Sequence, residues 1–259
     1  MDRNYPTWVL IIFIVFLIIV LIYIIACVAR YTALPLSGGS IYSGEIAAKT
    51  MKWHQTDQNE YDLVAVIVEY KVDNLEERIK SYIDALPEHT HFQVYITPKQ
   101  ENLLRQSKIG KYIKEDKVEL INMGIEKLTD MGYAKLLCSL DFWYSIRSEK
   151  VIFCQCDCKN RSIHVEDFLK YDFIGKPYSK HKNMEWHILF GIKGWKISTI
   201  FLYGDLSIRS KSKCINVLEK YPWDEKTPEN IWFSAFLPKV NGRLPSRHIT
   251  KIFTMNQNL

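Results

Sequence analysis

Three polar side chains follow apolar runs, a pattern that could place ligand-binding groups at one edge of a sheet. Asp157 and Gln155 come just after the run at residues 151–153, and Glu69 comes directly after the run at residues 63–68. β-branched and aromatic residues in such runs predict buried strands. A carboxylate beyond the end of a buried parallel strand lies at the carboxyl edge of the sheet, where open α/β folds bind their ligands. These residues therefore predict a ligand site at that edge.

Asp157 is also the candidate metal ligand, although its neighbours do not complete a metal site. Cys156 and Cys158 flank it, where a second acid would be expected. Hard divalent cations such as Mg²⁺ and Mn²⁺ prefer oxygen ligands. Asp205 or His248 could supply another ligand, but nothing in the spacing requires either of them. The sequence therefore predicts metal binding through Asp157 without fixing the other ligands.

Three cysteines alternate along the same segment, at positions 154, 156 and 158. On a strand their sulfurs would project from one face about 6.6 Å apart. Thiolates that share a zinc ion lie about 2.3 Å from the metal. The spacing therefore favours buried packing over a zinc site, and no disulfide framework can be derived from it.

The elements that position these residues follow from an alternation of strand and helix patterns. Apolar runs predict strands at residues 63–68, 92–97, 118–123 and 151–153, and helical patterns predict helices at residues 74–86, from Pro98 onward, and at residues 130–147. Four alternations predict an α/β fold with a mainly parallel, Rossmann-like sheet flanked by helices. Glu69, Thr97 and Asp157 are then expected along one common rim.

The second half of the domain has weaker patterns. We expect a short helix at residues 165–171, a turn at residues 175–178, a strand at residues 197–208 interrupted by Gly204 and Asp205, a helix at residues 210–221, and a helix with Thr227 as N-cap and Pro228 in its first position. Residues 243–259 are only loosely patterned.

The amino-terminal region predicts a membrane anchor. Residues 8–29 carry no charge, and as a helix they would span about 33 Å, enough for a bilayer core of about 30 Å. The run is long for the apolar part of a cleaved signal peptide, which is the alternative. We therefore expect a tail at residues 1–7, a single transmembrane helix at residues 8–29, a linker at residues 30–60 and one domain at residues 61–259. Flanking positive charges are nearly balanced, so the orientation is not determined.

Composition excludes one class of partner. The 259 residues carry a formal charge of +5, and the basic residues are scattered without a Lys/Arg block. Nucleic-acid-binding proteins concentrate such charge in a patch or stripe. We expect no nucleic-acid partner.

Several short motifs together resemble a glycosyltransferase-like family formerly described only as a domain of unknown function, over roughly residues 62–248. The matching residues are Gln155, Asp157, Asp167, Phe168, residues 171–175, Pro177, residues 206–210, Pro228, Glu229 and Phe233. The resemblance implies a nucleotide-sugar transferase domain of the GT-A type, in which Asp157 stands in for the usual metal-binding Asp-x-Asp. It implies a nucleotide-sugar site made by Glu69, Gln155, Asp157, Gly204, Asp205 and Arg209.

Chemistry of this kind has two further requirements. The departing diphosphate must be neutralised by a divalent metal or by Lys and Arg side chains. An inverting reaction also needs a base for the acceptor hydroxyl, and Glu229 is the candidate. Its alternative role is a favourable charge at a helix amino terminus. The acceptor, whether glycan, lipid or protein, is not indicated by the sequence.

The chain also departs from the family pattern. Residues 202–205 read Leu-Tyr-Gly-Asp where the family tends to have Gly-Asn-Gly-Gly, Asn230 replaces an acid, and Tyr178 replaces a tryptophan. These changes leave open an inactive sugar-binding, nucleotide-binding or scaffold domain. Similarity to anchored transferases favours a lumenal domain, whereas the glycosylation sequon at Asn160, close to Asp157, favours a cytosolic or unmodified one. We expect the lumenal location.

Overall fold

The computed structural model describes residues 59–68, 74–155, 164–178 and 201–256. The expected anchor at residues 8–29 and nearly all of the linker lie outside these ranges. Within the described residues, every helix is too short or too polar to cross a bilayer.

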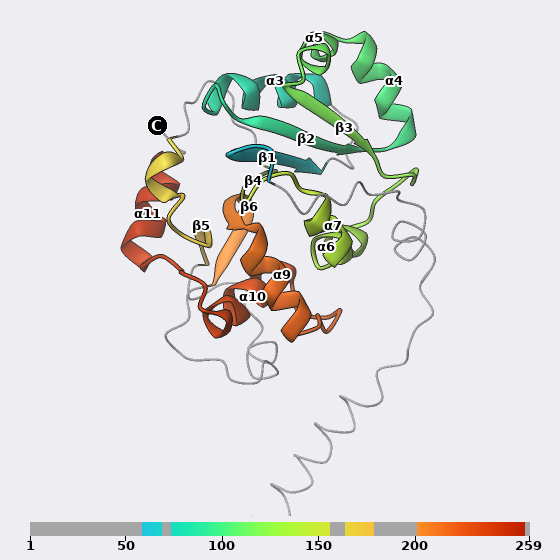
Figure 1. The fold of residues 1–259 in the computed structure, drawn as a ribbon. Coiled ribbons are helices and arrows are strands. Elements are labelled where there is room, and N and C mark those ends of the chain that lie inside the picture. The colour runs from blue at the N-terminus through green and yellow to red at the C-terminus, as the bar shows by residue number, and fades with distance from the viewer. Residues whose placement is uncertain (1–58, 69–73, 156–163, 179–200, 257–259) are drawn as a thin grey trace, which may run out of the picture. The chain divides into compact units, whose positions relative to one another are not determined.

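The centre of the domain is a mixed, mostly parallel sheet of six described strands in the order β3-β2-β1-β4-β6-β5 (Figure 1). The first four of these run parallel to one another, β6 is antiparallel to β4, and β5 is antiparallel to β6. The predicted Rossmann-like sheet is therefore confirmed. The strand bounds are β1 Leu63–Val68, β2 His91–Ile96, β3 Val118–Asn122, β4 Lys150–Cys154, β5 Phe173–Pro177 and β6 Leu202–Ser210.

Helices cover both faces of this sheet. On one face lie α3 (Leu75–Ala85), α4 (Pro98–Gln106) and α5 (Ile109–Lys114), drawn above the sheet in Figure 1. On the other lie α6 (Asp130–Leu137), α7 (Leu140–Ser145), α9 (Lys211–Lys220) and α10 (Glu229–Phe236). α11 (Arg247–Asn256) packs beside β5, and two short 3₁₀ helices, η1 (Glu166–Phe168) and η2 (Leu237–Val240), complete the described elements.

Two hydrophobic cores result from the alternation of side chains along β1. Val64, Val66 and Val68 face the core under α6, α7, α9 and α10, while Leu63 and Ile67 face the core under α3, α4 and α5. All six residues of β1 are buried, as expected for a strand covered on both faces.

The strand order reverses direction between β1 and β4. From β1 the chain passes through α3 to β2 and then through α4 and α5 to β3, always moving away from β4. It then returns through α6 and α7, on the opposite face, to β4 on the other side of β1. Such a topological switch point leaves a crevice at the carboxyl ends of the two strands, and open α/β sheets bind ligands there.

Several boundary predictions are wrong for identifiable reasons. The expected helix at residues 130–147 is two helices, because Ser139 accepts a hydrogen bond from the backbone N–H of Phe142 and starts a new helix. Thr227 does not cap α10, since its hydroxyl and N–H both donate to Asp224 in the preceding turn. Pro228 takes the N-cap position and Glu229 begins the helix.

Two elements were missed or misassigned. The expected turn at residues 175–178 is mostly strand β5, which pairs only with β6 and therefore tolerates Pro177 at its end. The loosely patterned tail forms α11, in which Thr250 and Phe253 face the core. The predicted strand at residues 197–208 begins in the described residues at Leu202 and runs without a break through Gly204.

Candidate functional site

A β-bulge lies at the carboxyl edge of the parallel strands, next to the end of β4. Cys154, the last residue of β4, pairs with Leu206, so the first residues of β6 extend beyond β4 at this edge. The register between β5 and β6 shifts between Ile174 and Lys176, which places extra residues of β6 opposite Gly175. A bulge bends its strand and redirects side chains, and bulges are common beside binding sites.

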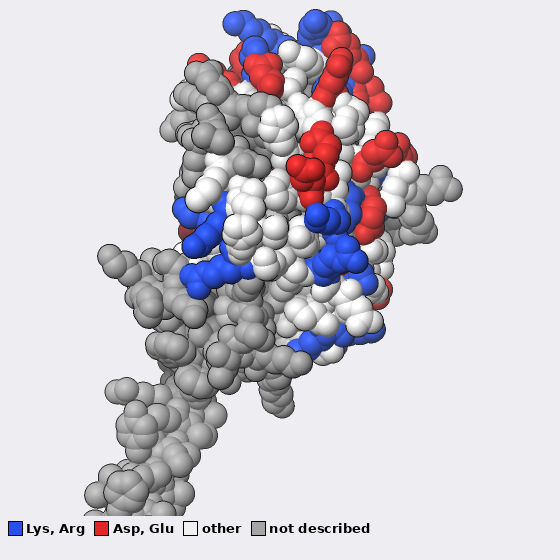
Figure 2. Space-filling model, turned by 90° about the vertical axis from the view of Figure 1, so that its left-hand side faces the viewer, with Lys and Arg blue, Asp and Glu red and all other residues white. Residues whose placement is uncertain are grey.

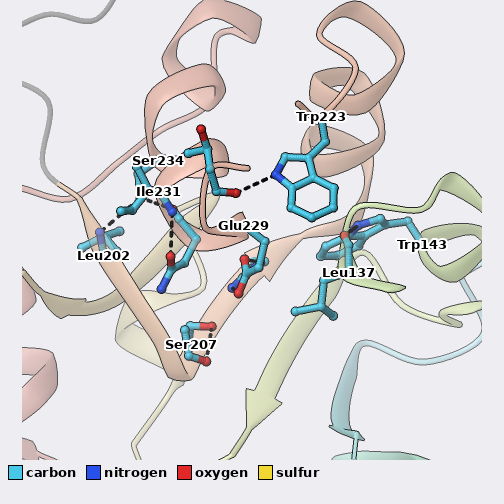
Figure 3. A network of polar contacts seen from close by, with 12 residues as sticks. Leu137, Trp143, Leu202, Ser207, Trp223, Glu229, Ile231 and Ser234 are labelled. Carbon is cyan, nitrogen blue, oxygen red and sulfur yellow. Dashed lines mark hydrogen bonds and ion pairs between the residues drawn. The ribbon is translucent and has the colours of Figure 1, made fainter. Parts of the chain in front are cut away.

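Arg209 and Glu229 form a bidentate ion pair behind this bulge. Nη1 of Arg209 donates to Oε2 of Glu229 at 3.0 Å, and Nη2 donates to Oε1 at 3.3 Å. The Arg209 side chain is fully buried, and 10% of the Glu229 side chain is exposed. Figure 3 shows Glu229 at the start of α10, pointing toward the strands. The pair therefore joins α10 to β6.

Three aromatic rings enclose the guanidinium of Arg209. Its central carbon lies 4.8 Å from the ring centroid of Phe153, 4.6 Å from that of Phe173 and 5.4 Å from that of Phe233. Cation–π attraction of this kind favours a buried cation. Burial lowers the pKa of Arg209, but the charge and hydrogen bonds of Glu229 outweigh it, so the pKa is raised overall. Glu229 is thus the counter-ion of a deeply buried charge.

Gly204 completes the packing around this pair. A Cβ atom at position 204 would lie 2.7 Å from Nη2 of Arg209 and 3.3 Å from Oε1 of Glu229. The first distance is too short for a side chain. The structure therefore brings together three of the predicted site residues, Gly204, Arg209 and Glu229.

Cys138 and Cys214 have pKa values that are influenced by the same ion pair. Burial raises the pKa of both thiols, and the charge of Glu229 raises them further, whereas that of Arg209 lowers them. Only a thiolate is an effective nucleophile. The two thiols therefore stay protonated and pack as small apolar groups. Cys154 is likewise buried, as its strand position predicts.

The remaining predicted site residues lie near the switch point or outside the described residues. The carbonyl of Gln155 accepts a hydrogen bond from Nη2 of Arg78, in α3, at 2.9 Å. Glu69 and Asp157 are outside the described residues, and nothing is described of the Asp205 side chain. β1 and β4 are parallel neighbours, with Val66 paired to Phe153. The strands that precede Glu69 and Asp157 thus end at the same edge.

No cluster of three or more His, Cys, Asp or Glu side chains suited to a metal ion occurs among the described residues. Asp157, the predicted metal ligand, is not one of them. His248, one of the two further ligands suggested, is exposed on α11. Metal binding by Asp157 therefore stays a prediction.

Three of the positions that depart from the family pattern contact one another. Tyr178 and Tyr203 are stacked with ring centroids 3.7 Å apart and an interplanar angle of 14°. The Tyr178 hydroxyl lies 3.5 Å from Oδ1 of Asn230. Asn230 follows Glu229 on α10, so this cluster continues the Arg209–Glu229 packing toward the carboxyl edge.

A cavity that the sequence reasoning missed lies between the start of α3 and α4. Its volume is about 300 Å³, at the lower end of the range for ligand pockets. Because α3 and α4 follow the exits of β1 and β2, it lies toward the carboxyl edge. It is lined by Asn74, Leu75, Glu76, Glu77, Gln100, Leu103, Leu104 and Ser107.

One sequence signal pointed toward this cavity. Thr97, Pro98 and Gln100 have the spacing of a capping box with proline in the first helical position, and the backbone N–H of Thr97 does donate to Oε1 of Gln100 at 2.8 Å. That motif fixes the orientation of Gln100 at the strand exit. The motif does not indicate the position of α3, which forms the other wall of the cavity.

Comparisons with known proteins identify a family and a distant structural similarity. Residues 118–259, more than half of the chain, match the family described as "Protein of unknown function (DUF5672)". A comparison with curated proteins found no match to this sequence. A crystal structure of S. aureus TarS, residues 1–349, superposes with a TM-score of 0.39 and 11% sequence identity, over 68% of this chain and 55% of that one. The chain thus spans about half the length of that structure, and a similarity this low carries no inference about function.

Proposed function

Because this chain belongs to the DUF5672 family of proteins of unknown function, its activity has to be inferred from its own site, and we propose that it is a membrane-anchored glycosyltransferase. It transfers a sugar from a nucleotide-sugar donor to an acceptor through a GT-A-type domain. The observation that carries the proposal is the topological switch point between the parallel strands β1 and β4. Glu69 directly follows β1, and Asp157 follows β4 after Gln155 and Cys156.

In this proposal, the diphosphate and the nucleoside of the donor bind in two different regions. The diphosphate lies over the switch point, where Asp157 and a divalent cation, Mg²⁺ or Mn²⁺, neutralise its charge. The nucleoside extends toward the cavity between α3 and α4. The hydrogen bond from Arg78 to the carbonyl of Gln155 supports this arrangement, because it ties the first turns of α3 to the exit of β4. The cavity and the switch point then have α3 in common.

Glu229 is the proposed base for the acceptor hydroxyl. It is the carboxylate that α10 holds beside the bulge, and its side chain keeps 10% exposure. Arg209 holds both of its oxygens, which fixes their direction but requires an acceptor to approach an already paired carboxylate. Arg209 itself is enclosed by aromatic rings, so its contribution to donor binding is indirect and passes through Glu229 and the bulge.

A second candidate function follows from the same ion pair. Both oxygens of Glu229 are engaged, and nine-tenths of its side chain is buried, as in a purely structural contact. This observation favours a domain that binds a nucleotide or a sugar without transferring it. The two candidates share the donor site and differ in turnover.

The partners of the proposed enzyme are the membrane, the donor and an acceptor that is a glycan, lipid or protein. On the face drawn in Figure 2, Lys and Arg side chains lie in several separate groups, with Asp and Glu groups beside and above them. A continuous basic stripe, the usual footprint of nucleic-acid binding, does not cross the described part of that face. We propose a lumenal domain, no nucleic-acid partner, and a single anchor at residues 8–29.

The test is thermal unfolding of the full-length protein in mild detergent with a panel of UDP-, GDP-, ADP- and CMP-sugars, each with and without Mn²⁺. A ligand at 100 times its Kd stabilises the fold by about 2.7 kcal/mol. For a domain of this size, that raises the Tm by about 5 to 11 °C.

Stabilisation by one class of donor, together with slow release of its nucleotide in the presence of water or an acceptor mixture, supports the transferase. Stabilisation without any release supports the binding domain. If no nucleotide sugar changes the Tm with or without Mn²⁺, both candidates are wrong.

A further inference from the structure

The cavity between α3 and α4 has walls suited to an uncharged, flat group. Leu75, Leu103 and Leu104 supply apolar surface, and Glu76 and Glu77 bring negative charge to the α3 side. Two carboxylates disfavour a phosphate, since like charges repel. If a nucleotide binds here as proposed above, its phosphates therefore point toward the switch point and its base enters the cavity.

The orientation of one polar side chain in this wall is fixed by its hydrogen bonds. Oε1 of Gln100 accepts from the backbone N–H of Thr97 at 2.8 Å and from the Thr97 hydroxyl at 3.0 Å. A backbone N–H can only donate, so the amide atom that it meets must be the oxygen. The Nε2 amino group consequently faces away from Thr97, and the amide cannot be flipped without losing the capping box.

Nε2 of Gln100 is a buried donor without an acceptor. Only 3% of the residue is exposed, and Nε2 makes no hydrogen bond to any atom in the described part of the chain. Leaving such a donor unpaired costs about as much as a hydrogen bond is worth, so buried polar groups are nearly always satisfied. An acceptor supplied by a ligand would remove this deficit.

We propose that Gln100 makes this cavity selective for uracil and guanine, which carry a carbonyl oxygen at C4 and C6 respectively, over cytosine and adenine, which carry an amino group at those same positions. This inference rests on the proposed function. O4 of uracil and O6 of guanine can accept from Nε2, whereas at the same ring positions cytosine and adenine carry the amino groups N4 and N6, each of which is a second donor. Two donors that face each other both remain unpaired.

A ligand reaches Nε2 by displacing part of the cavity wall, because Nε2 is itself covered. Leu103 lies one turn along the same face of α4, and 59% of its surface is exposed. It is therefore held by few packing contacts. A base that enters the cavity can displace this exposed side chain without disturbing the hydrogen bonds of Gln100 to Thr97.

The decisive substitution is Gln100→Glu. A capping box accepts Glu or Gln at this position, so the bond to the Thr97 N–H survives and α4 stays capped. The second oxygen of the Glu side chain replaces Nε2 and turns a donor into an acceptor. Gln106→Glu makes the same chemical change at an exposed position of the same helix and serves as the matched control.

The experiment measures Kd values for UDP, GDP, ADP and CDP on full-length wild type, Gln100→Glu and Gln106→Glu in detergent. We expect wild type and Gln106→Glu to bind UDP or GDP at least about tenfold more tightly than ADP or CDP. We expect Gln100→Glu to reduce that ratio at least about tenfold. A ratio is used because any general effect of the substitution on folding cancels in it.

The outcomes separate this inference from the proposal beneath it. Binding of all four nucleotides with no preference, or a preference that Gln100→Glu leaves equal to that of Gln106→Glu, overturns the role of Gln100 while the donor site stands. A wild-type preference for ADP or CDP overturns it as well. Failure of all four to bind overturns both the base site and the proposed nucleotide dependence.

Discussion

Removing the carboxylate of Glu229 should destabilise the whole domain, because it leaves the charge of Arg209 buried without its counter-ion. The guanidinium is fully buried among three aromatic rings and donates its two charge-assisted hydrogen bonds to Glu229. Breaking a buried pair by deleting one partner costs about 3 to 5 kcal/mol. That is a large part of the roughly 5 to 15 kcal/mol that keeps a domain folded.

For Glu229→Ala, this loss corresponds to a fall in Tm of about 6 to 20 °C in a domain of this size. The assay is thermal unfolding of the full-length protein in detergent, followed by circular dichroism and repeated in urea. Glu126→Ala is the matched control, because Glu126 is exposed. Its substitution should change stability by no more than about 0.5 kcal/mol.

A double variant shows whether the loss comes from the unpaired charge. Arg209→Met combined with Glu229→Leu replaces the ion pair with apolar groups of similar size, a change that is often neutral or stabilising. The double variant should therefore be more stable than Glu229→Ala. The reasoning is refuted if Glu229→Ala unfolds at the same temperature as Glu126→Ala, or if the double variant is the least stable of the set.

Three further predictions concern other packed positions. Gly204→Ala places a Cβ 2.7 Å from the caged guanidinium of Arg209 and should lower the free energy of unfolding by about 1 to 3 kcal/mol, measured by urea denaturation. Gly175→Ala places a Cβ 2.2 Å from the backbone oxygen of Tyr203, which cannot rotate away as a side chain can. Urea denaturation should therefore show a larger loss of unfolding free energy than for Gly204→Ala, and an equal or smaller loss would contradict the packing at the bulge. Burial lowers the pKa of His91 below its usual value of about 6.5; the charge of Arg147 also lowers it, and the charges of Asp116 and Glu119 oppose the shift. Because the folded state then disfavours protonation of His91, stability should fall as pH drops below about 6.5. The difference between the urea midpoints at pH 7.5 and pH 5.5 should shrink in His91→Phe, and an unchanged difference would show that other groups cause it.

Local signals in the sequence were sufficient for the first half of the fold. β1 occupies the predicted residues 63–68, because six consecutive apolar residues can be buried only in a strand that is covered on both faces. Pro98 starts α4 and α3 ends before Pro87, since proline lacks an N–H and fits the first turn of a helix but not its interior. The alternation of these elements then determined a parallel sheet.

Long-range packing determined the second half. β5 carries a glycine and a proline that indicate a turn locally, yet pairing with β6 makes it an edge strand. α11 lacks a strong local pattern and is positioned through Phe253, whose ring packs on Phe168 at a centroid distance of 5.0 Å. Such contacts between segments far apart in the chain leave no local periodicity.

The sequence by itself determined the class of fold, the sheet edge at which a ligand site was expected and the residue types at that edge, because strand burial, helix capping and strand direction depend on neighbouring residues. Only the tertiary structure decided that Arg209 and Glu229 are partners across 20 positions, that Gly204 must lack a side chain beside them, and that Gln100 lines a cavity closed by α3. The counter-ion of a buried charge and the walls of a cavity are determined by which residues lie close together in space. Neighbouring residues in the sequence do not show this.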